Sequence, residues 1–235
     1  MINSKTNARI TGVLFILGTV PIIIAMLLFG QHLSSPDILS AVAANHFSTL
    51  LFAFALIVMG IACAGIGISL YPILKKQNVG LAAGAMGLRI VEGALQIASA
   101  VGFFALVAVS QEFVKAGSPP DSFFQPAGAV IKAINDWTSN IYGLPFGIAA
   151  FFYYTIFYRT RLVPRWLSVW GLVGISLMLV SVLCNLLSLM DASSPVGTLL
   201  CLPILVQELI LAVRLIIKGF DTPSNTPSNT PSNTH

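Results

Sequence analysis

Four polar residues lie in stretches of the chain that are otherwise apolar: Arg89, Glu92, Gln96 and Glu208. The first three, together with Ser99, recur at steps of three and four residues, so they share one face of a helix with 3.6 residues per turn. An arginine at such a position could hold an anionic or polar group, and a carboxylate could relay protons or bind a cation. These four residues are the candidate substrate- or ion-binding site.

The composition indicates the environment of these residues. Of the 235 residues, 56% are hydrophobic and only 9% are charged, whereas a soluble domain has about 25% charged residues. The lipid bilayer is therefore the expected partner of most of the chain. The 12 basic residues are too few and too dispersed for a nucleic-acid surface, so we expect no nucleic-acid partner.

Six apolar runs are each long enough to cross a bilayer, which needs about 20 apolar residues. They are residues 10–29, 47–74, 81–110, 137–158, 166–190 and 196–217. We predict an all-α, polytopic membrane protein with six transmembrane helices in a single bundle. Residues 31–45 and 111–135 are predicted to be connections, with Pro21 kinking the first helix and Pro203 interrupting the last.

The basic residues predict how the helices are oriented. Nine of them lie at helix ends that six alternating spans place on one face: Lys5, Arg9, Lys75, Lys76, Arg159, Arg161, Arg165, Arg214 and Lys218. Lys115 and Lys132 lie on the other face. Because cytoplasmic loops carry an excess of Lys and Arg, both termini are predicted to be cytoplasmic. We also expect aromatic belts at both boundaries: Tyr153, Tyr154, Tyr158, Trp166 and Trp170 on the cytoplasmic side, and Trp137 and Tyr142 on the other.

The C-terminal segment differs in composition from the rest of the chain. Residues 1–220 are expected to form the six-helix transmembrane domain. From Asp221 to His235 the chain consists of Thr-Pro-Ser-Asn repeats with no apolar side chain. Such a segment has nothing to bury, so it is predicted to be a disordered cytoplasmic tail.

Depth along the helices predicts that the charged residues meet. Glu92 lies about 16 Å beyond Leu81, and Glu208 lies about 15 Å before Lys218, at 1.5 Å per residue. A charged residue at a helix centre costs roughly 2.5–3.5 kcal/mol, so these side chains should face inward. We therefore predict that the third and sixth transmembrane helices pack together and that Arg89 contacts both glutamates.

Three segments of the chain resemble a known protein family. The first segment, residues 71–92, contains YPILKKQN at 71–78, GLA at 80–82 and RIVE at 89–92. The second is LVPRWLSVWG at 162–171, and the third is ELILAVRLIIKGF at 208–220. They resemble the bacterial integral membrane proteins catalogued as domain of unknown function 4386. The resemblance implies a multi-pass protein of the bacterial plasma (inner) membrane with one six-helix domain. It implies no activity, cofactor or catalytic residue.

Two functions agree with the buried polar residues. In the first, the chain is a small transporter or ligand-binding membrane protein whose inner site takes a small polar or ionic ligand. In the second, it is a structural or partner-binding membrane protein in which the Arg/Glu cluster only holds helices together. The sequence predicts neither the ligand nor the oligomeric state.

A catalytic centre is not predicted, and we expect no cofactor. No histidine lies inside a predicted span, which argues against a Ser-His pair at depth. A third reading, a metal enzyme at the outer face, would draw on residues whose spacing matches no ligand motif: His32, His46, Asp37, Asp136 and Asp191. The sequence therefore favours a function other than catalysis.

The three cysteines lie in apolar runs and form no CxxC pair: Cys63, Cys184 and Cys201. They are predicted to be small buried side chains. Cys184 and Cys201 are equally far from the centre of the turn at residues 191–195, so a disulfide between them is an alternative that sequence alone does not decide.

Overall fold

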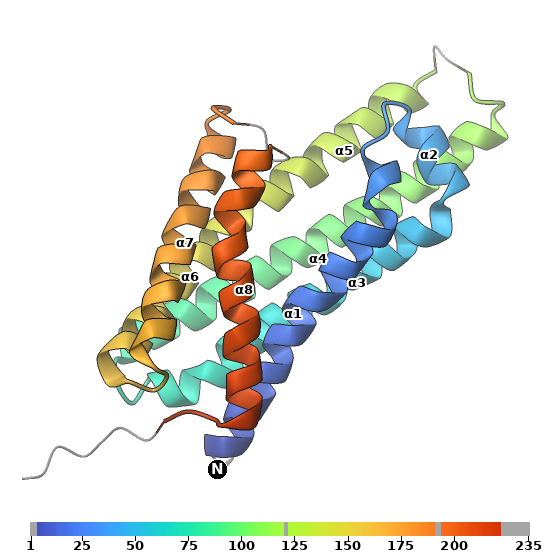
Figure 1. Ribbon diagram of the computed structural model, residues 1–235. Helices are drawn as coiled ribbons and strands as arrows, with labels where there is room; N and C mark the ends of the chain where they lie inside the picture. Colours follow the sequence, from blue (N-terminus) through green and yellow to red (C-terminus); the bar gives the residue numbers. More distant parts are fainter. Residues whose placement is uncertain (1–3, 120–121, 191–193, 222–235) are drawn as a thin grey trace, which may run out of the picture.

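The computed structural model describes residues 4–119, 122–190 and 194–221, and in these ranges its secondary structure is helical (Figure 1). The helices are α1 (Ser4–Leu33), α2 (Ile38–Ala44), α3 (His46–Leu74), α4 (Val79–Lys115), α5 (Phe124–Ile141), α6 (Gly143–Thr160), α7 (Arg165–Leu186) and α8 (Pro195–Ile217). Six segments are long and apolar enough to cross a membrane, with α5 and α6 together forming one of them. The predicted six-helix bundle is confirmed.

The prediction that Pro203 interrupts the last helix needs correction, whereas the kink at Pro21 stays a prediction. α1 contains Pro21 and α8 contains Pro203, yet both helices are continuous across these residues. A proline removes one backbone hydrogen bond, and neighbouring helices allow a transmembrane helix to tolerate this loss. Pro203 therefore does not interrupt α8.

The two predicted connections are also largely helical. α4 continues to Lys115 and α5 begins at Phe124, while α2 occupies most of the second half of residues 31–45. Apolar residues of α2 pack against the C-terminal half of α4, with Leu39, Leu106 and Phe113 in one buried apolar cluster. The prediction of loops was wrong because α4, with 37 residues, is about 55 Å long and extends beyond a 30 Å hydrocarbon core. α2 and α5 cover this extension.

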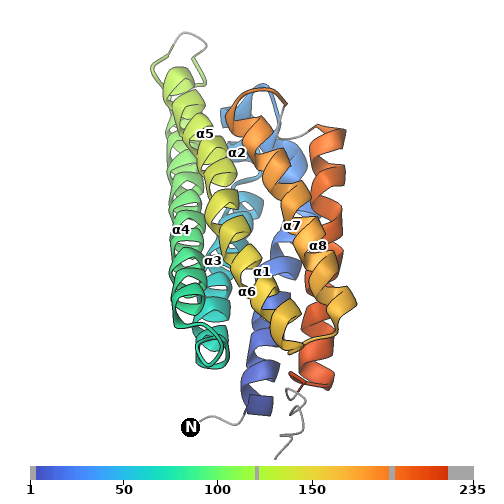
Figure 2. The same ribbon diagram turned by 90° about the vertical axis from the view of Figure 1, so that its left-hand side faces the viewer.

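The spans form a closed ring in chain order. Each of α1, α3, α4, α6, α7 and α8 packs against the next, and α8 packs back against α1. Figure 2 shows α5 and α6 as successive parts of one bent path beside α4. α4 and α8 occupy opposite places in the ring and share no packed interface. The prediction that the third and sixth transmembrane helices pack together was therefore wrong.

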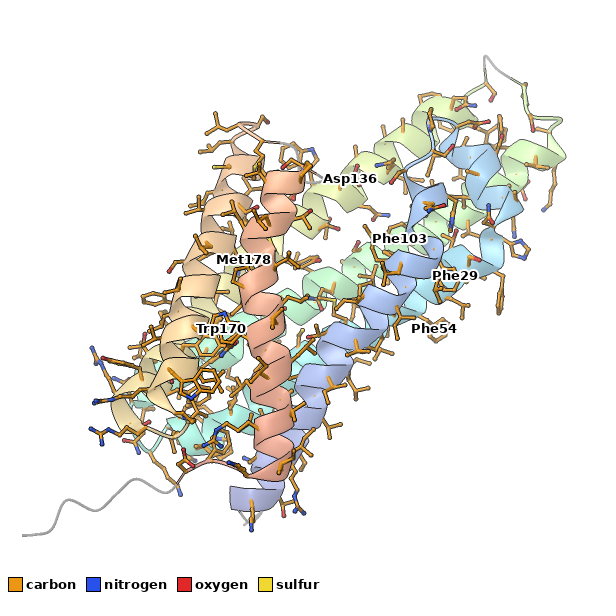
Figure 3. All side chains as sticks on the ribbon, in the orientation of Figure 1. Phe29, Phe54, Phe103, Asp136, Trp170 and Met178 are labelled. Atoms are coloured by element: carbon orange, nitrogen blue, oxygen red, sulfur yellow. The ribbon has the colours of Figure 1, made fainter. Side chains whose placement is uncertain are left out.

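The two sides of the ring are held together most closely near the termini. A Cβ atom on Gly12 of α1 would lie 2.6 Å from the carbonyl oxygen of Ala212 on α8, and one on Gly84 of α4 would lie 3.0 Å from the Phe152 ring of α6. Toward the other end, α1–α5 diverge from α6–α8 (Figure 1). Figure 3 shows Phe103 on the first side and Met178 on the second.

The nine basic residues named above lie at the end of the molecule that carries the termini, which we call the basic end. Its cytoplasmic location remains a prediction. Asp221, expected to begin a disordered tail, accepts a 2.6 Å ion pair from Arg214, and its amide donates a 2.8 Å hydrogen bond to the Leu162 carbonyl. Residues 222–235, the rest of the predicted tail, lie outside the described residues.

The cysteines are all free thiols. Cys63 is buried on α3, whereas Cys184 on α7 and Cys201 on α8 are partly buried. The alternative of a disulfide between Cys184 and Cys201 is therefore wrong.

Candidate ligand site in the central cavity

A cavity of about 450 Å³ lies inside the ring, and all six spans contribute to its wall. Its polar floor contains Arg89 and Glu92 of α4 and Glu208 of α8. Its mouth contains residues from the end of α5, the last turn of α7 and the first turn of α8, such as Asn140, Asn185 and Thr198. The cavity therefore runs from the middle of the bundle to the end opposite the basic end.

Three of the predicted site residues form one hydrogen-bonded network on α4. Arg89 Nη1 lies 3.0 Å from Glu92 Oε2, and Gln96 Nε2 donates a 3.1 Å hydrogen bond to Glu92 Oε1. Each of the three side chains is at most 2% exposed, as is Ser99 on the same face. The predicted shared face is confirmed, and the Glu92 carboxylate has a partner on each oxygen.

Two aromatic rings enclose the Arg89 guanidinium. Its central carbon lies 5.8 Å from the ring centroid of Phe15 on α1 and 5.1 Å from that of Phe146 on α6. Cation–π contacts of this kind are strongest when the cation is removed from water. Arg89 thus joins three spans, because its charge is satisfied by α4 while its faces are covered by α1 and α6.

Close contact between α3 and α4 fixes the position of Glu92. A Cβ atom on Gly93 would lie 2.3 Å from the carbonyl oxygen of Gly60, and one on Gly60 would lie 2.6 Å from the carbonyl oxygen of Gly93. Glycine at both positions allows the two backbones to touch, as small residues do in membrane helix pairs. The thiol of Cys63, one turn after Gly60, lies beside the Glu92 carboxylate.

Glu208 faces the same cavity from the opposite side of the ring. Its carboxylate accepts a 3.2 Å hydrogen bond from the Tyr153 hydroxyl of α6, and the residue is 8% exposed. Among the described residues, no ion pair to Glu208 is present. The prediction that Arg89 contacts both glutamates therefore holds for Glu92 and fails for Glu208.

A second buried polar link, next to Glu208, was missed. Tyr154 donates a 2.5 Å hydrogen bond to Gln207, whose amide donates a 2.9 Å hydrogen bond to the Leu167 carbonyl of α7. Tyr153 and Tyr154 are fully buried, so their predicted place in an aromatic belt was wrong. The adjacent pair Gln207–Glu208 inside an apolar helix was the signal that could have indicated a polar partner from another span.

A sequence model of the family described as Domain of unknown function (DUF4386) matches residues 10–219. The chain belongs to this family. Comparisons with curated proteins and with solved structures found no match. The resemblance inferred from residues 71–92, 162–171 and 208–220 is thus confirmed, and the function of this DUF4386 protein has to be argued from its own geometry.

Several buried polar atoms on the α4 face of the DUF4386 protein have no hydrogen-bond partner in the described part of the chain. They are Arg89 Nε, Gln96 Oε1 and Ser99 Oγ. Buried polar groups are normally paired with protein, water or ligand. This face of α4 therefore has hydrogen-bonding capacity beyond its internal network.

The residues considered for an outer-face metal site are not gathered in the DUF4386 protein. Among the residues that the structure describes, no three His, Cys, Asp or Glu side chains form a group that could hold a metal ion. His32 instead bonds Thr49 at 2.9 Å, and Asp136 pairs with Lys132 at 2.6 Å. Asp191 lies outside the described residues, and the reading of an outer-face metal enzyme gains no support.

Proposed function

We propose that this chain is a small transporter or ligand-binding membrane protein that takes a small organic cation into its central cavity, with Glu208 as the ionic contact. The observation that carries the proposal is the place of Glu208. It is a carboxylate at the floor of a cavity lined by all six spans, without an ion pair among the described residues.

Charge favours a cation over an anion. Arg89 and Glu92 neutralise each other at 3.0 Å, so the ionised floor carries one net negative charge from Glu208. Attraction between charges is stronger in a low-dielectric interior than in water. An anionic ligand would have to compete with Glu92 for Arg89 and would be repelled by Glu208, whereas a cation would complete the second half of a pair.

The rest of the wall suits a ligand that also has apolar and hydrogen-bonding parts. Neutral polar side chains lie nearer the mouth, among them Thr19, Ser139 and Asn140, while Met59 and Met178 contribute apolar surface. A cavity of about 450 Å³ falls in the usual range for small-molecule sites. An amine or quaternary ammonium compound with a hydroxyl or short alkyl group matches this lining.

The bend between α5 and α6 supports transport in particular. The helical path bends near Tyr142, whose backbone stays helical and hydrogen-bonded to both helices, and residues on both sides of the bend, including Asn140 and Gly143, line the cavity. Transporter substrate sites lie near the bilayer midplane and are often formed by spanning helices that depart from a regular path. With the termini in the cytoplasm, as the basic residues predict, the mouth would face the outside of the cell.

The alternative, a cluster that only holds helices together, is favoured for part of the predicted site. Arg89, Glu92 and Gln96 are almost fully buried and bond to one another. We therefore assign these three residues a structural role in shaping the floor. Glu208 is the predicted site residue that we assign to the ligand.

The test uses Cys201, which lines the cavity, as a reporter in a C63S/C184S variant in lipid nanodiscs. Methylammonium, tetramethylammonium and choline should each slow its reaction with N-ethylmaleimide, while dimethylbutanol, the neutral isostere of choline, should not. E208Q should abolish the protection. The matched variant E112Q, which removes an exposed carboxylate at the far end of α4, should retain it. Equal protection in the parent and in E208Q for every cation would contradict the proposal.

A further inference from the structure

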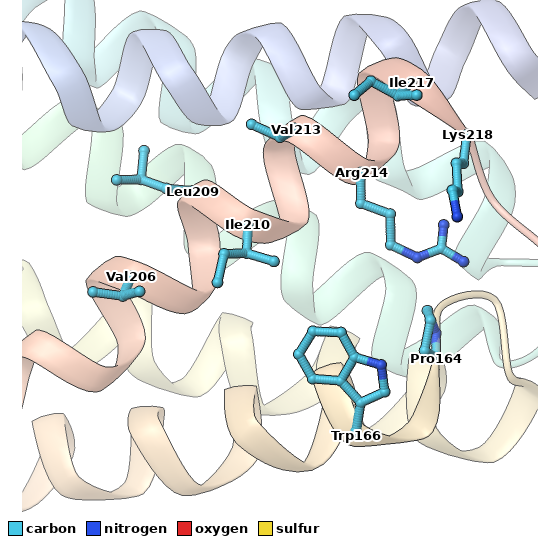
Figure 4. Close-up of a pocket in the computed structure, with 9 residues that line it drawn as sticks. All are labelled: Pro164, Trp166, Val206, Leu209, Ile210, Val213, Arg214, Ile217 and Lys218. Carbon is cyan, nitrogen blue, oxygen red and sulfur yellow. The ribbon is translucent and has the colours of Figure 1, made fainter.

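A second concavity lies on the outer surface of the ring, between α7 and α8 near the basic end (Figure 4). Its volume is about 580 Å³. One wall is the apolar ridge formed by Val206, Ile210, Val213 and Ile217 of α8, and Trp166 of α7 stands opposite. We call this concavity the α7–α8 groove.

The groove is separate from the central cavity. Val206, Ile210 and Val213 are between 36% and 50% exposed, whereas Gln207, Glu208 and Leu211 of the same helix are buried toward the ring interior. The apolar ridge therefore points outward, to the surface that a lipid bilayer would cover.

Cationic side chains stand at the end of the groove. Arg214 is fixed there because its guanidinium pairs with Asp221 at 2.6 Å and donates a 3.4 Å hydrogen bond to the Gly219 carbonyl. Lys218 is exposed and lines the same end. In the described part of the chain, no carboxylate lies within ion-pair distance of its ammonium group. The groove is thus apolar along its length, and because Asp221 neutralises Arg214, its end carries one net positive charge, that of Lys218.

We propose that the α7–α8 groove binds one anionic phospholipid, with an acyl chain along the α8 ridge and the phosphate group at Lys218, beside the Arg214–Asp221 pair. Basic pockets between transmembrane helices recognise acidic headgroups in this way. Trp166, 57% exposed at the same end, lies where tryptophan meets the headgroup region of a bilayer.

The length of the ridge matches a lipid. From Val206 to Ile217 the helix rises about 16 Å at 1.5 Å per residue, which is close to half of a 30 Å hydrocarbon core. One leaflet's acyl chain therefore spans the ridge while its headgroup reaches the cationic end. A second copy of this chain would bring a like-charged basic end against Lys218, so charge complementarity favours the acidic lipid.

The experiment measures quenching of Trp166 fluorescence by brominated phospholipids. Trp137 and Trp170 are replaced by phenylalanine in the full chain, which is reconstituted with either brominated phosphatidylglycerol or brominated phosphatidylcholine in a background of the unbrominated lipid. The ratio of the two apparent binding constants gives the preference for the acidic headgroup. K218Q is compared with K76Q, which removes an exposed charge from the same end but outside the groove.

We expect a preference for phosphatidylglycerol on the order of fivefold, which K218Q reduces toward one and K76Q leaves unchanged. Equal quenching by the two lipids in the parent would overturn the proposal. So would an equal loss in K218Q and K76Q, which would indicate only general attraction to the leaflet. Protection of Trp166 from both lipids would show that a protein surface, such as a second copy, covers the groove, and would overturn it as well.

Discussion

Arg89 and Glu208 line one cavity from opposite sides of the six-helix ring, and the structure pairs Arg89 with Glu92 rather than with Glu208. This relationship divides the buried charges into two groups with different roles. In our proposal the Arg89–Glu92 pair shapes the floor of the cavity, while Glu208, which faces the cavity with a single tyrosine donor, contacts the ligand.

The division predicts different costs for the two glutamates. E92Q leaves the Arg89 charge buried without its partner, and removing one member of a buried pair costs about 3–5 kcal/mol. E208Q removes a charge that no described residue neutralises, so the free energy of unfolding should change by less than about 1 kcal/mol. Reversible unfolding in mixed detergent micelles measures the free energy of unfolding of both variants relative to the parent.

A double-mutant cycle checks that the E92Q cost arises from the pair. R89Q/E92Q should recover at least half of the E92Q loss, because no uncompensated charge remains. If E208Q destabilised the protein as much as E92Q, the two groups of charges would not be separable.

The contact between Gly60 and Gly93 predicts an unusually severe effect of one methyl group. G93A places a Cβ atom 2.3 Å from the Gly60 carbonyl oxygen, so α3 and α4 must separate and Glu92 must move. A loss of about 1–3 kcal/mol is expected from such overpacking. G87A is the matched control on the same helix, since a Cβ atom there has no neighbour within 4 Å.

G87A should be neutral or stabilising by up to about 1 kcal/mol, because alanine favours a helix more than glycine does. Thermal melting of the two variants in detergent gives the comparison. Similar melting temperatures for G93A and G87A would contradict the close contact.

The two buried tyrosines are predicted to differ. Y154F leaves the Gln207 carbonyl oxygen buried without its 2.5 Å donor, which costs about 1–3 kcal/mol. Y153F removes the donor to Glu208, but that carboxylate can be hydrated from the cavity, so its cost should be smaller. The measurement is the unfolding free energy of each variant relative to the parent. A larger loss in Y153F than in Y154F would be inconsistent with a cavity open to water at Glu208.

The three free thiols predict how much mass the protein gains on alkylation. Protein purified without reductant, denatured and treated with maleimide should gain three adducts, one for each of Cys63, Cys184 and Cys201. A gain of one adduct, with the other two thiols released only by reduction, would indicate the disulfide that the structure excludes.

The spacing of residues predicted the parts of the site that depend on one helix. Arg89, Glu92, Gln96 and Ser99 share a buried face because helical periodicity fixes which side chains lie together. The six spans were also predictable, since bilayer thickness sets the length of an apolar run.

What the sequence did not predict depends on contacts between helices. Equal depth suggested that Glu208 meets Arg89, but depth does not determine the order of helices around a ring. Likewise, residues 111–135 are too polar to indicate a packed helix, and the contact of α5 with α4 that orders this region is not visible in the local sequence. Pairings such as Tyr154 with Gln207 join residues that are 53 positions apart, beyond the reach of any local pattern.

The most direct test of the central claim is the rate at which Cys201 reacts with charged thiol reagents in the C63S/C184S variant. A cavity open to water, with a negative floor at Glu208, should give faster reaction with cationic trimethylammonium-ethyl methanethiosulfonate than with its anionic sulfonate counterpart, relative to their rates with a free thiol. E208Q should reduce that preference severalfold, while E112Q should not. Absence of reaction with either reagent, or an unchanged preference in E208Q, would contradict the account.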